Sequence, residues 1–124
     1  MNYCSTEKAP RAIGPYSQAV KVAGMMFTSG QIPLDPATSK LVEGDFETMT
    51  RRVFENLKAV LESGGATFAN VVKTTVFLKD FGDFQKMNAV YAEYFGDHKP
   101  ARSTVEAARL PMDALIEIEM IAVV

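Results

Sequence analysis

The sequence predicts an α+β fold of two layers, with two helices on one face of a mixed sheet of about six strands. Three observations favour this class. Two amphipathic segments with helical spacing alternate along the chain with short runs rich in β-branched residues. Glycine, aspartate or proline stands at most boundaries between these segments. The 124 residues contain no internal repeat and no linker-like stretch, so we expect a single domain over residues 1–124.

The first part of the chain predicts a hairpin. Residues 17–22 and 25–29 are largely apolar, and Ala23-Gly24 between them is typical of a tight two-residue turn. Residues 34–44 are rich in Pro, Asp, Thr and Ser, which indicates a surface loop, with one short edge strand expected at 40–42. The segment before the hairpin carries no strong pattern, and we expect a frayed N-terminus that includes Cys4.

Two helices are predicted next. Asp45 can cap the first, and Gly64-Gly65 can end it. Its apolar positions recur at helical spacing: Phe46, Met49, Val53, Leu57, Val60 and Leu61. Asp83 can cap the second helix, and Gly96 can close it. Its apolar stripe consists of Phe84, Met87, Val90, Tyr91, Tyr94 and Phe95.

Three further strands are expected at 70–78, 101–107 and 116–124, of which the last alternates glutamate with aliphatic residues. Two helices can cover only one face of the resulting sheet. The apolar positions on the other face must be covered by another copy of the chain, which predicts an obligate homo-oligomer.

Composition excludes several classes of function. Hydrophobic residues make up 48% and charged residues 23%, with a formal net charge of -2 and no basic stripe, so nucleic-acid binding is not expected. No run has the length of a membrane span or the form of a signal peptide, and we expect a cytoplasmic protein without membrane contact. The single Cys4 excludes an internal disulfide, and with the single His98 it argues against a metal site. We give loop residue His98 a surface role.

Arg102 is the most informative residue. It lies in a predicted strand among small and branched neighbours. A guanidinium is always charged, is costly to bury unpaired, and grips a carboxylate through two parallel hydrogen bonds. Arg102 is therefore either locked to an acid of the protein or awaits an acidic ligand. An inter-subunit ion pair with an acid such as Glu106 or Glu117 is the structural alternative to ligand binding.

The chain resembles the RidA/YjgF family of reactive-intermediate deaminases. The segments that carry the resemblance occur in the family's order and spacing: residues 13–18, 28–33, 72–78, 100–103, 108–111 and 116–119. The resemblance implies a chorismate-mutase-like fold and a homotrimer whose sheets form a central barrel, with sites in the clefts between subunits. It also implies hydrolysis of 2-aminoacrylate, 2-iminobutanoate and related enamines and imines to 2-oxo acids and ammonia. These small 2-imino and enamino acids are the expected partners, and no metal or organic cofactor is implied.

The resemblance assigns roles to two charged residues. Arg102 matches the family's carboxylate-binding arginine, and Glu117 matches an acid that could position water or move protons. An ion pair of Glu117 with Arg102, or with a lysine of another subunit, is the alternative. Glu119 points the same way as Glu117 in an ideal strand, so periodicity does not choose between them.

Further residues match the family's substrate-binding positions. Tyr16 could donate its hydroxyl, Ser29 could bond a polar ligand group, and Gly30 would let the backbone approach closely. Packing at a subunit edge for Tyr16, and turn formation for Ser29 and Gly30, are equally good explanations. Asn88 matches an asparagine near the site, although a hydrogen bond to backbone in the core would also explain it.

Thr104 departs from the family, because many members have cysteine at this place. A hydroxyl there excludes covalent thiolate catalysis but can still bond the substrate.

Two other functions compete with deamination. A nuclease or translation inhibitor is a label attached to relatives, but the acidic balance and the lone basic pair Arg51-Arg52 argue against it. A non-catalytic trimer that binds a small acid would keep Arg102 and could dispense with Glu117, whose presence favours catalysis.

Overall fold

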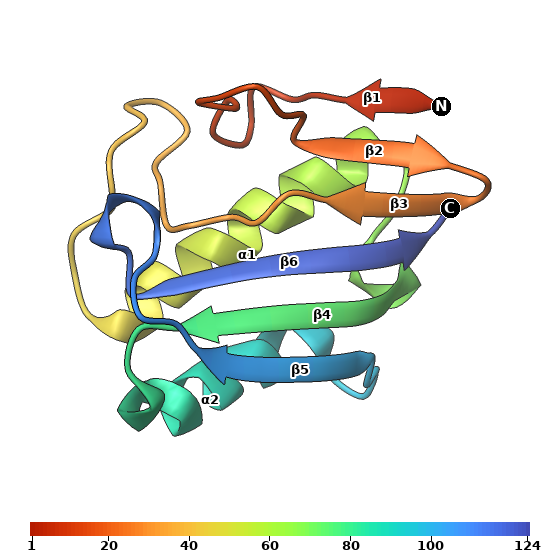
Figure 1. Cartoon of the computed structure of the whole chain (residues 1–124). Coiled ribbons are helices and arrows are strands. Elements are labelled where there is room, and N and C mark those ends of the chain that lie inside the picture. Colours follow the sequence, from red (N-terminus) through yellow and green to blue (C-terminus); the bar gives the residue numbers. More distant parts are fainter.

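The computed structural model describes residues 1–124 and contains one six-stranded sheet in the order β1-β2-β3-β6-β4-β5. Strands β4 and β5 are parallel and all other neighbours are antiparallel, so the sheet is mixed as predicted (Figure 1). The strands are β1 (Asn2–Cys4), β2 (Ala19–Val22), β3 (Met25–Thr28), β4 (Val71–Leu78), β5 (Ala101–Glu106) and β6 (Ile116–Val123). The helices are α1 (Phe46–Ser63) and α2 (Phe84–Phe95), with 3-10 turns η1 (Phe68–Asn70), η2 (Phe81–Asp83) and η3 (Pro111–Asp113).

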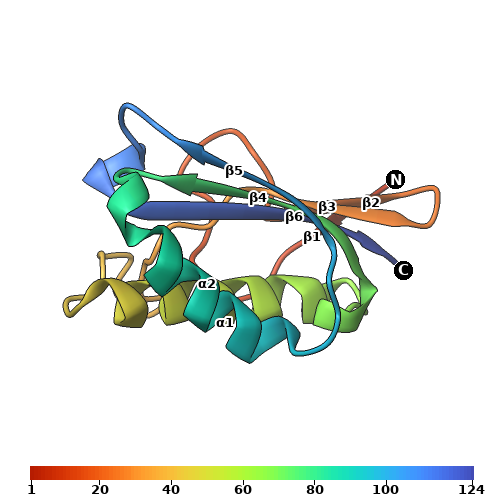
Figure 2. The same ribbon diagram turned by 90° about the horizontal axis from the view of Figure 1, so that it is seen from below.

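Both helices lie on one side of the sheet, as Figure 2 shows edge-on. Asp45 caps α1, and its carboxylate accepts the backbone N–H of Thr48 at 2.8 Å. The apolar stripe of α1 packs on the sheet, where Phe54 and Leu57 are fully buried beside Ile118 of β6. Gly64 ends the helix and Gly65 follows with φ 84°. The predicted two-layer α+β class is therefore confirmed.

The hairpin turn is also confirmed. Ala23 and Gly24 both have positive φ, 51° and 76°, as a type I′ turn requires at its two central positions. This turn follows the right-handed twist of the strands and sets the register of β2 against β3, in which Val20 faces Phe27.

The expected frayed N-terminus is wrong. Residues 2–4 form β1 at one edge of the sheet, with Cys4 opposite Ala19 and only 7% exposed. The following segment is held by the buried side chain of Gln18, whose amide bonds the backbone of Thr6 and Pro10. These contacts join residues far apart in sequence, so no local sequence pattern predicts them.

Two smaller predictions need correction. Asp83 stands at the start of α2, but its side chain accepts no capping hydrogen bond. Asp80 acts instead one turn earlier, where its carboxylate accepts the N–H of Gly82 at 2.7 Å and caps η2. The edge strand expected at 40–42 is reduced to a single bridge between Leu34 and Leu41.

The second face of the sheet carries no helix, and we call it the open face. Along β6, Ile118 and Met120 are buried under the helices, whereas Glu117 and Glu119 point to the open face. Apolar residues of β2, β3, β5 and β6 share this face and are each 42–46% exposed: Val22, Phe27, Val105 and Val123. The prediction of an uncovered apolar sheet face is confirmed for the single chain.

Loops cover one end of the open face. A small second core forms there from Ile32, Leu34, Leu110 and Ala114, with Phe77 of β4 packed against it. This cluster fixes the loops on both sides of the start of β6, and these loops supply part of the wall of a cavity.

Candidate functional site

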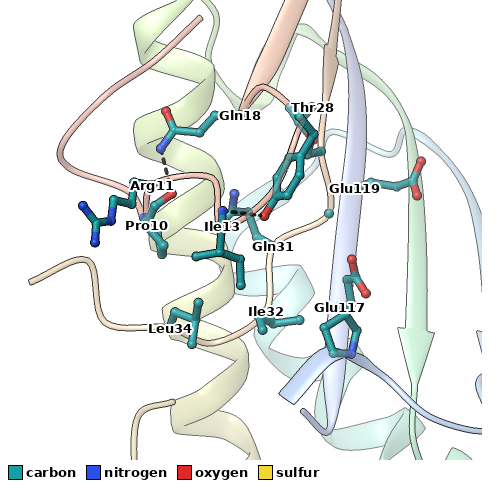
Figure 3. A pocket seen from close by; sticks show the side chains of 14 residues that line it. Pro10, Arg11, Ile13, Gln18, Thr28, Gln31, Ile32, Leu34, Glu117 and Glu119 are labelled. Atoms are coloured by element: carbon teal, nitrogen blue, oxygen red, sulfur yellow. Dashed lines mark hydrogen bonds between the residues drawn. The ribbon is translucent and has the colours of Figure 1, made fainter. Parts of the chain in front are cut away.

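A cavity of ≈ 410 Å³ lies on the open face where β3, β6 and the N-terminal loop meet (Figure 3). Four residues predicted for the site line it: Tyr16, Ser29, Gly30 and Glu117. They come from three separate parts of the chain, and the sheet brings them together. We call this group the acid half-site.

Glu117 lies directly against Gly30. A Cβ atom built at position 30 would stand 2.8 Å from the carboxyl carbon of Glu117, closer than real side chains approach. Glycine at 30 therefore leaves the space that the carboxyl group occupies, whereas a close approach of this backbone to a ligand stays a prediction.

The Glu117 carboxyl group is electrostatically unusual. It is half-buried and makes no ion pair within the chain. Burial raises its pKa above the ordinary value, and the charge of neighbouring Glu119 raises it further. A salt bridge from Glu117 to Arg102 does not form within the chain, whereas pairing with Arg102 or with a lysine of another subunit stays a prediction.

Backbone hydrogen bonds fix the loop opposite Glu117. Gln31 and Ile118 exchange N–H···O bonds of 2.9 and 3.2 Å, which extends the sheet beyond β3. Ser29 donates its hydroxyl to the carbonyl oxygen of Ser17 at 2.5 Å, and its N–H bonds the carbonyl of Gln18. The Ser29 hydroxyl thus ties two distant segments together and does not form a turn, and its oxygen can still accept a bond from a ligand.

Tyr16 stands at the rim of the cavity. Its side chain is exposed, and its hydroxyl accepts the backbone N–H of Ile13 at 3.4 Å. This long contact holds the ring near the opening and leaves the hydroxyl proton available to a ligand.

Several lining residues were not predicted. Ile13, Gln31 and Pro111 also line the cavity, and each lies inside a segment that carries the family resemblance, which was the available signal. Arg11 lines it too, but Figure 3 shows its guanidinium directed away from Glu117 and Glu119.

Arg102 lies elsewhere. Its side chain leaves β5 on the helix side of the sheet, with the guanidinium carbon 4.8 Å from the ring centre of Tyr91 and 5.6 Å from that of Phe84. It makes no ion pair. Glu106, one acid considered for it, instead accepts the backbone N–H of Phe81 at 2.8 Å. Arg102 is therefore not locked to an acid of its own chain, whereas an inter-subunit ion pair with Glu106 or Glu117 stays a prediction.

Asn88 and Thr104 accompany Arg102. Asn88 is one helical turn from Phe84 and from Tyr91, and it is half-buried on the same side of α2. Its side chain makes no hydrogen bond in the chain, so the core bond considered for it is wrong. Thr104 follows Arg102 by two residues and so shares its face of β5. We call these three residues the arginine half-site.

The two half-sites cannot meet within one chain. Arg102 is opposite Thr74 of β4, and Glu117 is opposite Phe77 on the other side of that strand. These positions differ by three residues, roughly 10 Å along a strand, and they point to opposite faces of the sheet. One protomer thus presents an unpaired cation and an unpaired acid in two different directions.

Other candidate groups take no part in either half-site. A ring nitrogen of His98 lies 2.6 Å from the carbonyl oxygen of Val71, and its side chain is on the surface as predicted. No group of three His, Cys, Asp or Glu side chains is placed to hold a metal ion. No helix is long and apolar enough to cross a membrane.

The fold and the two half-sites define a class of small α+β proteins with an open sheet face. Residues 6–124 match the family described as Endoribonuclease L-PSP. The chain is 61% identical over 117 residues to a RutC family protein of Pyrococcus abyssi, with 94% of this chain and 92% of that protein covered. It is 52% identical over 122 residues to the 2-iminobutanoate/2-iminopropanoate deaminase of Salmonella typhimurium, with 96% and 94% covered.

The structure also resembles the crystal structure of E. coli TdcF with bound serine. The TM-score is 0.95 at 42% identity, with 100% of this chain and 99% of that chain covered. These matches cover nearly the whole chain. The protein belongs to the RidA/YjgF family.

Proposed function

We propose that this protein is a hydrolytic deaminase of 2-aminoacrylate, 2-iminobutanoate and related enamines and imines. Its active form would be a homotrimer in which the arginine half-site of one subunit faces the acid half-site of the next. The unpaired Arg102 and the unpaired, half-buried Glu117 carry this proposal. Opposite charges that cannot meet in one chain would meet between chains, and the open apolar face supplies a surface for such an association.

In this arrangement Arg102 binds the substrate carboxylate. Its guanidinium carbon lies over the rings of Tyr91 and Phe84, and no acid of the same chain pairs with its N–H groups, which leaves them free to donate. Two parallel hydrogen bonds to a carboxylate fit that geometry. The adjacent imine carbon is thereby held at a fixed distance from the arginine, and unproductive orientations are removed.

Glu117 moves the protons. An enamine substrate first takes up a proton at carbon and loses one from nitrogen, which gives the imine. Water then attacks the imine carbon and gives up a proton, so that a C–O bond forms and the electron pair of the C=N bond moves to nitrogen. Protonation of that nitrogen, loss of the proton from the new hydroxyl group and cleavage of the C–N bond then form the C=O bond and release ammonia and the 2-oxo acid. A carboxyl group whose pKa is raised by burial gives up its proton less readily than an exposed one, so Glu117 is suited both to take and to return these protons.

Relatives support the substrate class. A protein 52% identical to this chain is named as an imine deaminase, and the structurally similar TdcF binds serine, a small molecule with a carboxylate.

The proposal is tested by coupling a serine or threonine dehydratase to the protein and following 2-oxo acid or ammonia release. We expect faster release with the native chain and none of this acceleration with Arg102→Ala. Equal rates for the two proteins would remove the catalytic proposal. Retained binding of small acids without acceleration would favour a non-catalytic binding trimer.

A nuclease or translation inhibitor is the second candidate, because the matching family is described as an endoribonuclease. The basic pair Arg51-Arg52 gives little support to RNA binding, because both side chains already have partners. Arg51 forms a two-bond ion pair with Glu93, and Arg52 donates to the side chain of Asn56. RNA cleavage that survives rigorous purification and disappears in Arg102→Ala would favour this candidate over deamination.

A further inference from the structure

Arg102 is held by a small network that the proposed reaction does not use directly. The Tyr91 ring lies under the guanidinium at 4.8 Å, and the Tyr91 hydroxyl is 2.8 Å from the hydroxyl of Thr74. Thr74 is fully buried and is the β4 residue directly opposite Arg102. Thr74 thus lies opposite Arg102 in the sheet and also forms a hydrogen bond with Tyr91, whose ring contacts Arg102.

We propose that Tyr91, anchored by Thr74, is a positioning residue that fixes the plane of the Arg102 guanidinium. The inference rests on the proposed function, because it assumes that Arg102 binds the substrate carboxylate. Tyr91 does not need to touch the substrate. It would act by restricting the arginine to the orientation in which both N–H groups point at the ligand.

The surroundings of Tyr91 support a fixed ring. Its ring centre is 4.6 Å from that of Phe95 and 5.8 Å from that of Phe54, with the Phe54 ring nearly perpendicular at 84°. Burial raises the pKa of Tyr91, so its hydroxyl keeps its proton and can share it with Thr74. Side-chain packing and one hydroxyl bond therefore hold the ring on several sides.

A rigid aromatic surface matters because arginine has a long and flexible side chain. Without a fixed support, binding a carboxylate must also order that chain, which weakens affinity. The ring attracts the cation electrostatically and restrains its plane before the ligand arrives. The expected signature is a change in carboxylate affinity and KM that is larger than any change in kcat.

A matched control exists on the same helix. Tyr94 also uses its hydroxyl at 2.8 Å, as a donor to Glu55 of α1, and its ring stacks on Phe54 at 4.7 Å. It makes no stacking contact with Arg102. Tyr91→Phe and Tyr94→Phe therefore remove the same group, each with one hydrogen bond, and only the first touches the network of the arginine.

The experiment measures binding of 2-oxobutanoate, the product class, by calorimetry, together with KM and kcat in the coupled assay. We expect Tyr91→Phe and Thr74→Val each to raise Kd and KM roughly three- to tenfold, with kcat changed by less than about twofold. The double variant should be little worse than either single one, because both remove the same bond. Tyr94→Phe should bind like the native protein, and thermal unfolding checks that all variants fold.

Tyr91→Leu removes the ring itself and should weaken binding by about tenfold or more. Suppose that Arg102→Ala abolishes binding of 2-oxobutanoate, whereas Tyr91→Phe, Thr74→Val and Tyr91→Leu bind it like the native protein. This result would overturn the positioning role of Tyr91 but not the carboxylate-binding role of Arg102. Equal weakening by Tyr94→Phe would also overturn the positioning role, since a general loss of packing would then explain the effect. If the native protein and Arg102→Ala bind equally, the carboxylate-binding role in the proposed function fails together with this inference.

Discussion

The acid half-site and the arginine half-site are built in different ways. Glu117 lies in a cavity whose opposite wall is fixed by backbone bonds, such as the Gln31–Ile118 bridge, and by the absence of a side chain at Gly30. Arg102 lies on an edge strand and is oriented by side chains, through the rings of Tyr91 and Phe84. Glu117 therefore lies against backbone that a substitution cannot move without displacing the carboxyl group. The orientation of Arg102 depends on side-chain contacts, each of which can be weakened separately by substitution.

The largest expected effect comes from inactivating one half-site at a time. Arg102→Ala and Glu117→Gln should each lower deaminase activity by about 10²–10⁴-fold. If every site takes one half from each of two subunits, mixing the two variants after unfolding and refolding should restore about a quarter of native activity, because half of the subunits supply each part. The mixture is measured in the coupled assay beside each variant refolded alone.

A site formed within one chain predicts no recovery of deaminase activity in that mixture. Activity would then stay at the level of the separate variants at every mixing ratio. This outcome would contradict the assignment of the two half-sites to different subunits while leaving the deaminase chemistry open.

The second effect tests the rigidity of the acid half-site. Gly30→Ala places a methyl group where the Glu117 carboxyl lies, so the carboxyl must move. We expect kcat to fall by roughly tenfold or more, while thermal unfolding shows a folded protein. Ser29→Ala is the neighbouring control: it removes one hydroxyl bond and should cost less activity. Native kcat in Gly30→Ala would contradict a tightly placed carboxyl group.

The smallest effect concerns stability and pH. A carboxyl group whose pKa is raised in the folded state binds more protons when folded, so the folded state loses stability as pH rises through the acidic range. Glu117→Gln should therefore raise Tm at pH 7, by roughly 2 °C, and change it less near pH 4, where Glu117 is largely protonated.

This result also bears on the neighbouring subunit. A lower Tm for Glu117→Gln at pH 7 would mean that a cation of another subunit stabilises the carboxylate. Glu117 would then be paired with a cation of the next subunit, either the Arg102 that the proposed site places opposite it or a lysine.

Much of the fold was predictable from local sequence. The stripe of α1, its Asp45 cap, the Ala23-Gly24 turn and the strand at Val71–Leu78 follow from spacing and from the conformations that single residues favour. The edge strand β1 and the cap at Asp80 were missed. β1 exists because Cys4 pairs with Ala19, a contact across the chain that no short window records.

The candidate site was predictable only in its parts. Tyr16, Ser29, Gly30 and Glu117 were expected from motif resemblance, and the cavity brings them together. Within one chain Arg102 pairs with neither Glu117 nor Glu106, which the sequence could not show, because residue spacing gives no information about which face of the sheet each strand presents. Their pairing between subunits stays a prediction. Tyr91 was expected only as part of an apolar stripe, since its contact with Arg102 requires α2 to cross β5.

The amino-acid order fixed which segments are helices and strands, because hydrogen bonding and side-chain periodicity act over neighbouring residues. It also fixed which charged side chains were available for chemistry. Strand order and register were decided only when the sheet formed, and they direct Arg102 toward the helices and Glu117 toward the open face. The physical reason is that a strand sends alternate side chains to opposite faces, so orientation depends on pairing between segments that are distant along the chain.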